Sequence, residues 1–271
     1  MSGQNNSMSR RAALKNMMIG LGAGLAAVGS GHVAWASSGT SSAPADLLPA
    51  GAATLKDLQK RLEKAPRRRD FKTVPMVLTD PSQWDEKALN EVLQYAGGPK
   101  QAWDNTSLKG PWLNLMRNAM NVQIWSFKHP DFLAVSATHG TAHLALYDDS
   151  LWEKYQFAKL TKGKYKTNIF IKDAQAPQTN PADFENPDGV FSPRGDSIAV
   201  LQKRGAVFLA CHNEIWELTL SLHKTEVNPD RLTHAQMAAE FTNHLIPGAV
   251  LTPGIVGTLP ELTLAGYQYA K

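Results

Sequence analysis

The chain has 271 residues, of which 43% are apolar and 19% charged, and it contains a single cysteine. This composition excludes a disulfide-stapled mini-protein, a collagen-like fibre and a highly charged disordered chain. The formal charge is +4, and three of the basic residues lie in the first 36 positions, which hold no acidic residue. Removing that stretch leaves a charge of +1. The remainder lacks the basic surface of a nucleic-acid-binding protein, so we expect no nucleic-acid partner.

The first 36 residues have the order of a secretory signal: a basic stretch at 9–15, an apolar run at 17–29 and small residues that end at Ala36. The pair Arg10-Arg11 resembles the twin-arginine export signal. The apolar run is shorter than the ~20 residues that span a bilayer, so no stable membrane span is expected after cleavage. We therefore expect residues 1–36 to be a twin-arginine signal peptide, with the twin-arginine translocase as export partner, cleavage near Ala36 and a periplasmic mature protein.

Residues 37–69 are expected to form a flexible linker followed by a short amphipathic helix. The linker is rich in Ser, Gly, Ala and Pro. The helix is predicted over 54–64, because Leu55, Leu58 and Leu62 recur at helical spacing.

Residues 70–271 alternate between predicted strands and helices. Strands are predicted at 74–78, 132–137, 206–210 and 249–252. Helices are predicted at 81–95, 112–127, 141–147, 150–160, 196–203, 213–223, 233–243 and 254–269. Such alternation implies crossover connections and a parallel sheet, so the expected fold class is α/β. The polar stretch 161–196, rich in Pro, Asn, Asp and Gly, is a long loop of the kind that is either functional or disordered.

Four segments resemble, in the same order, parts of the DsrE-like (DsrE/DsrF, YchN-type) sulfur-relay family. They are 113–118, 135–140, 205–213, and 245–250 followed by Gly254 and Gly266-Tyr267. The resemblance implies a three-layer parallel-sheet domain, frequent homo-oligomers and a sulfur-carrier role for Cys211, with a sulfur donor or acceptor protein as partner. The chain differs from small members of that family by its export signal, by residues 37–110 and by the insertion at 161–196.

Cys211 is the main chemical candidate. In parallel sheets, sites lie beyond the carboxyl ends of the strands, and both His139 and Cys211 follow a predicted strand. Cys211 also precedes a helix, whose N-terminus favours a thiolate, so we expect a thiol pKa below the ordinary ~8.5. His139 or His212 would supply a positive neighbour or move a proton. The alternative is that Cys211 is an inert, buried, small apolar residue.

A second interpretation uses metal. His139 and His143 are spaced i, i+4, and His212 beside Cys211 offers further ligands for zinc, copper or a haem iron. These histidines are weak candidates, and no cofactor is expected under the sulfur-carrier interpretation. The sequence contains no GxSxG nucleophile motif, no GxGxxG after a strand and no phosphate-binding P-loop.

Three hypotheses follow from these observations. The first is a periplasmic protein for sulfur handling or sulfur carriage through Cys211. The second is a metal- or haem-binding module that uses the histidines. The third is a non-catalytic, oligomeric accessory protein that kept the fold without the chemistry. The sequence leaves open whether the protein is an enzyme.

Overall fold

The computed structural model of the chain describes residues 47–172, 182–225 and 227–271, and these form one parallel sheet in the order β4-β3-β2-β1-β5. The strands are β1 (Lys100–Asn105), β2 (Leu133–Thr138), β3 (Val207–Cys211), β4 (Val250–Thr252) and β5 (Gln268–Ala270). All four pairings in the sheet are parallel. Parallel neighbours require crossovers, and helices supply them on both faces of the sheet.

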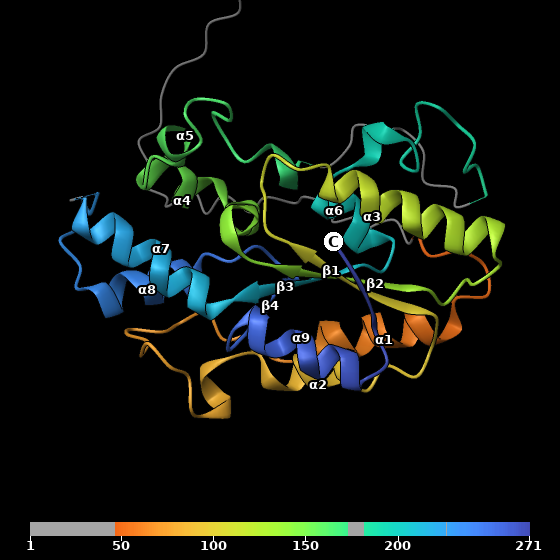
Figure 1. Cartoon of the computed structure of the whole chain (residues 1–271), viewed down its shortest axis with the longest axis horizontal. Helices are drawn as coiled ribbons and strands as arrows, with labels where there is room; N and C mark the ends of the chain where they lie inside the picture. The colour runs from red at the N-terminus through yellow and green to blue at the C-terminus, as the bar shows by residue number, and fades with distance from the viewer. Residues whose placement is uncertain (1–46, 173–181, 226) are drawn as a thin grey trace, which may run out of the picture. The chain divides into compact units, whose positions relative to one another are not determined.

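The α-helices are α1 (Ala53–Lys64), α2 (Glu86–Leu93), α3 (Trp112–Asn121), α4 (Asp149–Lys154), α5 (Phe157–Leu160), α6 (Ile198–Lys203), α7 (His212–Lys224), α8 (His234–Asn243) and α9 (Ile255–Leu264). The 3-10 helices are η1 (Pro81–Gln83), η3 (Gly140–Leu146), η4 (Ile169–Ile171) and η5 (Pro193–Gly195), and the π-helical η2 (Val122–Ser126) continues α3. Figure 1 shows α1, α2 and α9 on one face of the sheet and α3 and α6 on the other. The prediction of a three-layer parallel α/β domain is confirmed.

Strand β3 explains why the core has two halves. Val207, Leu209 and Cys211 belong to the apolar cluster shared with α1, α2 and α9, while Phe208 and Ala210 belong to the cluster on the opposite face. Successive side chains of a strand point to opposite faces, so a strand covered on both sides is apolar throughout. The whole of β3 is accordingly buried.

Helix α1 is part of the domain core. Leu55 and Leu58 are fully buried, and Leu62 is nearly so, in the cluster that covers one face of the sheet. The backbone N–H of Leu55 is satisfied by the carboxylate of Asp131 at 2.9 Å. The domain predicted to begin at residue 70 excludes this helix, whereas its buried face packs in the same apolar cluster as α2 and α9.

The first strand differs from the prediction. Residues 74–78 form irregular chain, and Met76 and Val77 are each 59% exposed. The strand at this stage of the chain is β1, which pairs with β2 from Lys100 to Asn105 and carries β5 on its other side. Its sequence, KQAWDN, has no apolar run: only Ala102, Trp103 and Asn105 are buried, and Asn105 is polar. Hydropathy therefore does not reveal it.

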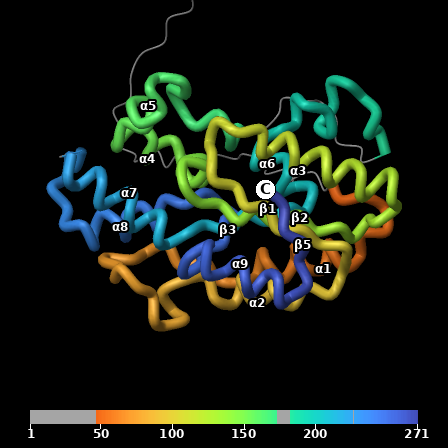
Figure 2. The backbone as a smooth tube through the Cα atoms, viewed as in Figure 1, coloured from red at the N-terminus to blue at the C-terminus, as the bar shows by residue number. Residues whose placement is uncertain are grey.

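The last predicted helix is also shorter than expected. Helix α9 ends at Leu264, and Gly266 adopts a φ of +86°, a left-handed conformation that suits glycine and closes helices. The N–H of Tyr267 then bonds the carbonyl of Leu262 at 3.0 Å. The chain turns and adds β5 as a short edge strand that pairs with β1, next to the C-terminus labelled in Figure 2.

The described part of the 161–196 insertion is fixed to α3. The guanidinium of Arg117 donates to Asp196 at 2.6 Å and to the carbonyl of Phe191 at 2.9 Å. The ring of Trp125 stacks on Phe184, with centroids 4.7 Å apart. These contacts hold residues 182–196 against α3 and η2, so this part of the insertion is packed.

Several sequence predictions concern residues outside the described ranges. They are the signal peptide at 1–36 with its cleavage near Ala36, the linker up to residue 46, and the centre of the insertion at 173–181. In the ranges that are described, no helix has the length and hydropathy needed to cross a bilayer.

Candidate functional site

The carboxyl ends of the central strands meet at one edge of the sheet. Asn105 of β1 pairs with Thr138 of β2, and Thr138 is in register with Ala210 of β3. The residues that follow, His139 and Cys211, are therefore neighbours at the strand ends. In parallel α/β sheets this edge is where ligands bind, so the sheet brings the two residues to the expected place.

Cys211 ends β3 and caps α7. Its Sγ accepts the backbone N–H of Glu214 at 3.4 Å and that of Ile255 at 3.3 Å. Glu214 lies in the first turn of α7, and Ile255 is the first residue of α9. The sulfur atom thus lies at the N-termini of two helices, each with a partial positive charge and N–H groups that lack partners inside their own helix. This arrangement favours negative charge on the sulfur.

Burial opposes that effect and outweighs it. Cys211 is 4% exposed, and burial raises the pKa of its thiol above the ordinary value, although the N–H groups of Ile255 and Glu214 act in the opposite direction. The nearby carboxylate of Glu214 raises the pKa further. The expectation of a lowered thiol pKa is therefore wrong for this structure: a helix N-terminus is present, but the sulfur is removed from water.

His143 is the histidine that contacts Cys211. Its Nε2 accepts the backbone N–H of Cys211 at 2.9 Å. The ring is fully buried, and burial lowers the pKa of His143 to about 3, with a smaller contribution from His139. Since Nε2 is the acceptor, the neutral ring carries its proton on Nδ1, which has no partner among the described residues. His143 holds the end of β3 in place as a neutral acceptor.

His139 has a different partner. Its Nε2 donates to Asp104 of β1 at 2.7 Å, and the other oxygen of Asp104 accepts the hydroxyl of Tyr269 at 2.7 Å. Burial raises the pKa of Asp104, but the hydrogen bonds from Tyr269 and His139 outweigh it, and the net pKa is lowered. Asp104 orients the imidazole of His139 at the strand edge. Asp104 is not among the residues predicted from the sequence, because β1 carries no apolar run to mark it.

Glu214 connects the loops at this edge. Its carboxylate accepts the backbone N–H of Gly140 at 2.9 Å, while its own N–H bonds the sulfur of Cys211. Burial raises the pKa of Glu214, and the hydrogen bond from Gly140 partly opposes the shift. Gly140 has a φ of +55°, and a Cβ there would lie 2.7 Å from the carbonyl oxygen of Thr106. The close loop packing therefore requires glycine.

His212 points away from the thiol. Its Nε2 donates to the carbonyl of Pro75 at 2.8 Å, and the ring is buried. Burial lowers the pKa of His212. The side chain thus holds the irregular segment 74–78 against α7. It does not supply the charged neighbour predicted beside Cys211.

The histidines do not assemble into a metal site. The described residues contain no group of three or more His, Cys, Asp or Glu side chains arranged to hold a metal ion. His139, His143 and His212 each use Nε2 for a different partner. The i, i+4 spacing of His139 and His143 does not place them on one face, because η3 is a 3-10 helix, in which residues three apart share a face.

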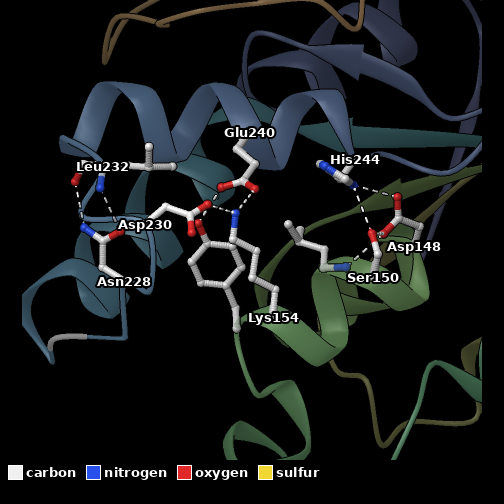
Figure 3. Close-up of polar contacts among 10 residues, drawn as sticks. Asp148, Ser150, Lys154, Asn228, Asp230, Leu232, Glu240 and His244 are labelled. Carbon is white, nitrogen blue, oxygen red and sulfur yellow. Dashed lines mark hydrogen bonds and ion pairs between the residues drawn. The ribbon is translucent and has the colours of Figure 1, made fainter.

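A second polar cluster lies between α4 and α8 (Figure 3). Asp148 and Ser150 both contact Nδ1 of His244, at 2.8 Å and 3.3 Å. A hydrolytic triad needs the acid and the nucleophile on opposite ring nitrogens, so this geometry is not one. Asp148 instead caps α4 through the N–H of Leu151 at 2.9 Å, and the cluster joins the two helices.

The fold and this edge define a parallel α/β domain in which strand β3 ends in a buried thiol between two helix N-termini. Comparison of the chain with protein-family models, with curated proteins and with solved structures finds no match. Of the predicted site residues, Cys211 and His139 share the strand edge, and His143 contacts the thiol residue through its backbone. Asp104 and Glu214 join the site only through tertiary contacts.

Proposed function

We propose that this protein carries sulfane sulfur as a persulfide on Cys211. The observation that supports it is the position of Sγ, which accepts N–H groups from the first turns of both α7 and α9. Two helix N-termini at one sulfur stabilise a thiolate on it, and their positive ends also favour the charge on the terminal sulfur of a persulfide bonded to it. This is the sulfur-carrier role that the resemblance to the DsrE-like family implies.

The proposed step is a thiolate displacement on a polysulfide. The thiol first loses its proton to water, and the thiolate then attacks a sulfane sulfur. A new S–S bond forms on Cys211 while the S–S bond to the rest of the polysulfide breaks. The leaving group is a polysulfide thiolate one sulfur shorter. Transfer to an acceptor thiolate reverses these events, so the protein is neither oxidised nor reduced over a full cycle.

Burial makes this step depend on local opening. With Cys211 4% exposed, polysulfide reaches the sulfur only when the chain packed around it moves aside. The same burial protects a persulfide from water and from stray thiols once it has formed. Slow loading and a long-lived adduct are expected together.

The setting of this function is part of the proposal. A twin-arginine signal at 1–36 would deliver the folded protein to the periplasm, where a donor or acceptor protein would exchange sulfur with it. Assembly into a homo-oligomer is proposed from the same family resemblance. Exported protein that begins near Ser37, and precursor retained in the cytoplasm when Arg10 and Arg11 are both replaced by Lys, would support the export route.

Intact-mass analysis tests the sulfur chemistry. Native protein incubated with polysulfide should gain about 32 Da, one sulfur atom, and lose it on reduction. The Cys211→Ser variant should gain nothing. The control is alkylation by iodoacetamide with and without denaturant, which reports whether the thiol is reached in the native state. A wild-type thiol that resists both polysulfide and iodoacetamide until the chain unfolds would show an inert core cysteine, as the accessory-protein hypothesis requires.

A further inference from the structure

A groove of about 610 Å³ lies at the opposite edge of the sheet from Cys211. It runs between α1 and the turns that precede β3 and β4, and its walls include Val207 at the start of β3 and Gly248 before β4. Cys211 lies at the far end of β3. The groove is separate from the thiol site, because none of the residues of that site lines it.

The floor of the groove is apolar. Leu62 of α1 and Ala206 and Val207 at the start of β3 line it, together with Leu48 and Pro247. A volume of this size with an apolar lining and a few polar groups is typical of sites for small organic ligands, which range over about 300–1,000 Å³.

Two glutamine side chains fix the walls. Gln59 of α1 donates to the carbonyl of Gly205 at 3.0 Å, and Gln202 of α6 donates to the carbonyl of Pro247 at 3.1 Å. A Cβ at Gly248 would lie 2.7 Å from Nε2 of Gln202, so the turn before β4 needs glycine for this contact. The groove is therefore a preformed feature of the fold.

The rim of the groove is basic. Four of its side chains are cationic and one is acidic: Lys56, Lys60, Arg67, Lys203 and Glu63. Lys56 and Lys203 have interaction partners of their own, so the positive charge offered to a ligand is that of Lys60 and Arg67. The rim attracts an anion.

Arg67 is the cation best placed to bind one. Its side chain is 17% exposed and lies 3.8 Å from the carboxylate of Asp85. That carboxylate already accepts Arg69 at 2.8 Å and the N–H of Leu251 at 2.7 Å. Nη1 of Arg67 donates to the carbonyl of Ala65 at 2.9 Å, while its buried Nε has no hydrogen-bond partner in the described ranges. One carboxylate thus faces two guanidinium groups, which leaves uncompensated positive charge beside an apolar floor.

We propose that the groove binds an amphipathic carboxylate with a single hydrocarbon chain, its carboxylate at Arg67 and Lys60 and its chain on the apolar floor. Nη2 of Arg67 and the ammonium of Lys60 can each donate a charge-assisted hydrogen bond to the carboxylate, and such bonds are stronger than those between neutral partners. The apolar floor contributes through the area it removes from water. This site is independent of the thiol chemistry.

A dansyl-labelled undecanoic acid is a suitable probe, because its emission rises when it enters an apolar site. The full chain should bind it with a dissociation constant in the micromolar range, and decanoate should displace it while decanol does not. Lys60→Glu should weaken binding about tenfold, since it replaces a charge-assisted contact with repulsion. Arg67→Gln should weaken it at least as much.

Lys64→Glu is the matched control, because Lys64 lies on the same helix, is exposed and does not line the groove. It should leave the affinity unchanged, which separates the groove from the general charge of the surface. Lys60 is exposed, so its substitution also avoids the folding risk at Arg67. Displacement by decanol equal to that by decanoate would overturn the proposal, as would equal losses in Lys60→Glu and Lys64→Glu, or the absence of probe binding.

Discussion

Arg117 is expected to hold the insertion at 182–196 onto the domain. Its guanidinium makes three hydrogen bonds: to Asp196 at 2.6 Å, to the carbonyl of Phe191 at 2.9 Å and to Asn114 at 2.6 Å. The Arg117 side chain is 7% exposed and that of Asp196 20%. Arg117→Met keeps the length of the side chain but removes all three donors. It leaves the largely buried carboxylate of Asp196 without its cation, while the carbonyl of Phe191 keeps Asn121 as a donor.

The loss should be large because the pair is buried. Removing one member of a buried ion pair costs about 3–5 kcal/mol. A second cation, Arg204, is 1% exposed nearby; burial and then the charge of Arg117 lower the pKa of Arg204 to about 9. Relief of that repulsion offsets part of the loss, so we expect about 3 kcal/mol for Arg117→Met.

Urea denaturation, followed by tryptophan fluorescence, measures this value. With a slope of about 2–3 kcal/mol/M, the midpoint should fall by about 1 M. Arg194→Met is the control, because Arg194 pairs with Asp188 at 3.0 Å but the two side chains are 74% and 66% exposed. Such a pair contributes less than about 1 kcal/mol. Equal midpoint shifts for the two variants would refute the role assigned to Arg117.

Three further outcomes are expected at the strand edge. Neutral His143, whose folded-state pKa is about 3 against an ordinary 6.5, contributes stability that is complete above about pH 6.5 and is lost as the pH falls toward 3, up to about 5 kcal/mol. His143→Gln, which can still accept the Cys211 N–H, should flatten the acid side of a stability–pH curve; an unchanged slope would falsify the assignment. Glu214→Gln should lower the pKa of Cys211 by removing a negative neighbour. Iodoacetamide should then label the thiol faster at neutral pH, and slower labelling would contradict this. Gly140→Ala should lower the free energy of unfolding, measured by urea denaturation, by about 1–3 kcal/mol, because its Cβ would lie 2.7 Å from the carbonyl oxygen of Thr106. An unchanged free energy of unfolding would show that the loop adjusts to the added methyl group.

The local sequence was sufficient to predict the strands and helices whose apolar residues follow a recognisable pattern. The apolar runs at 132–137 and 206–210 predict doubly covered strands, and β2 and β3 are buried along their whole length. The spacing of Leu55, Leu58 and Leu62 predicts α1. These predictions succeed because the pattern of burial repeats with the geometry of the element itself.

Strand β1 and the environment of the thiol needed the tertiary structure. The polar sequence of β1 forms a strand because β2 and β5 supply backbone partners on both sides. Sequence alone places Cys211 at a strand end before a helix. Its pKa, however, depends on burial and on Ile255, 44 residues away, whose N–H reaches the sulfur. A local pattern determines which face of an element is apolar. Desolvation and hydrogen-bond partners are set by segments distant in the chain, so they are decided only when those segments pack together.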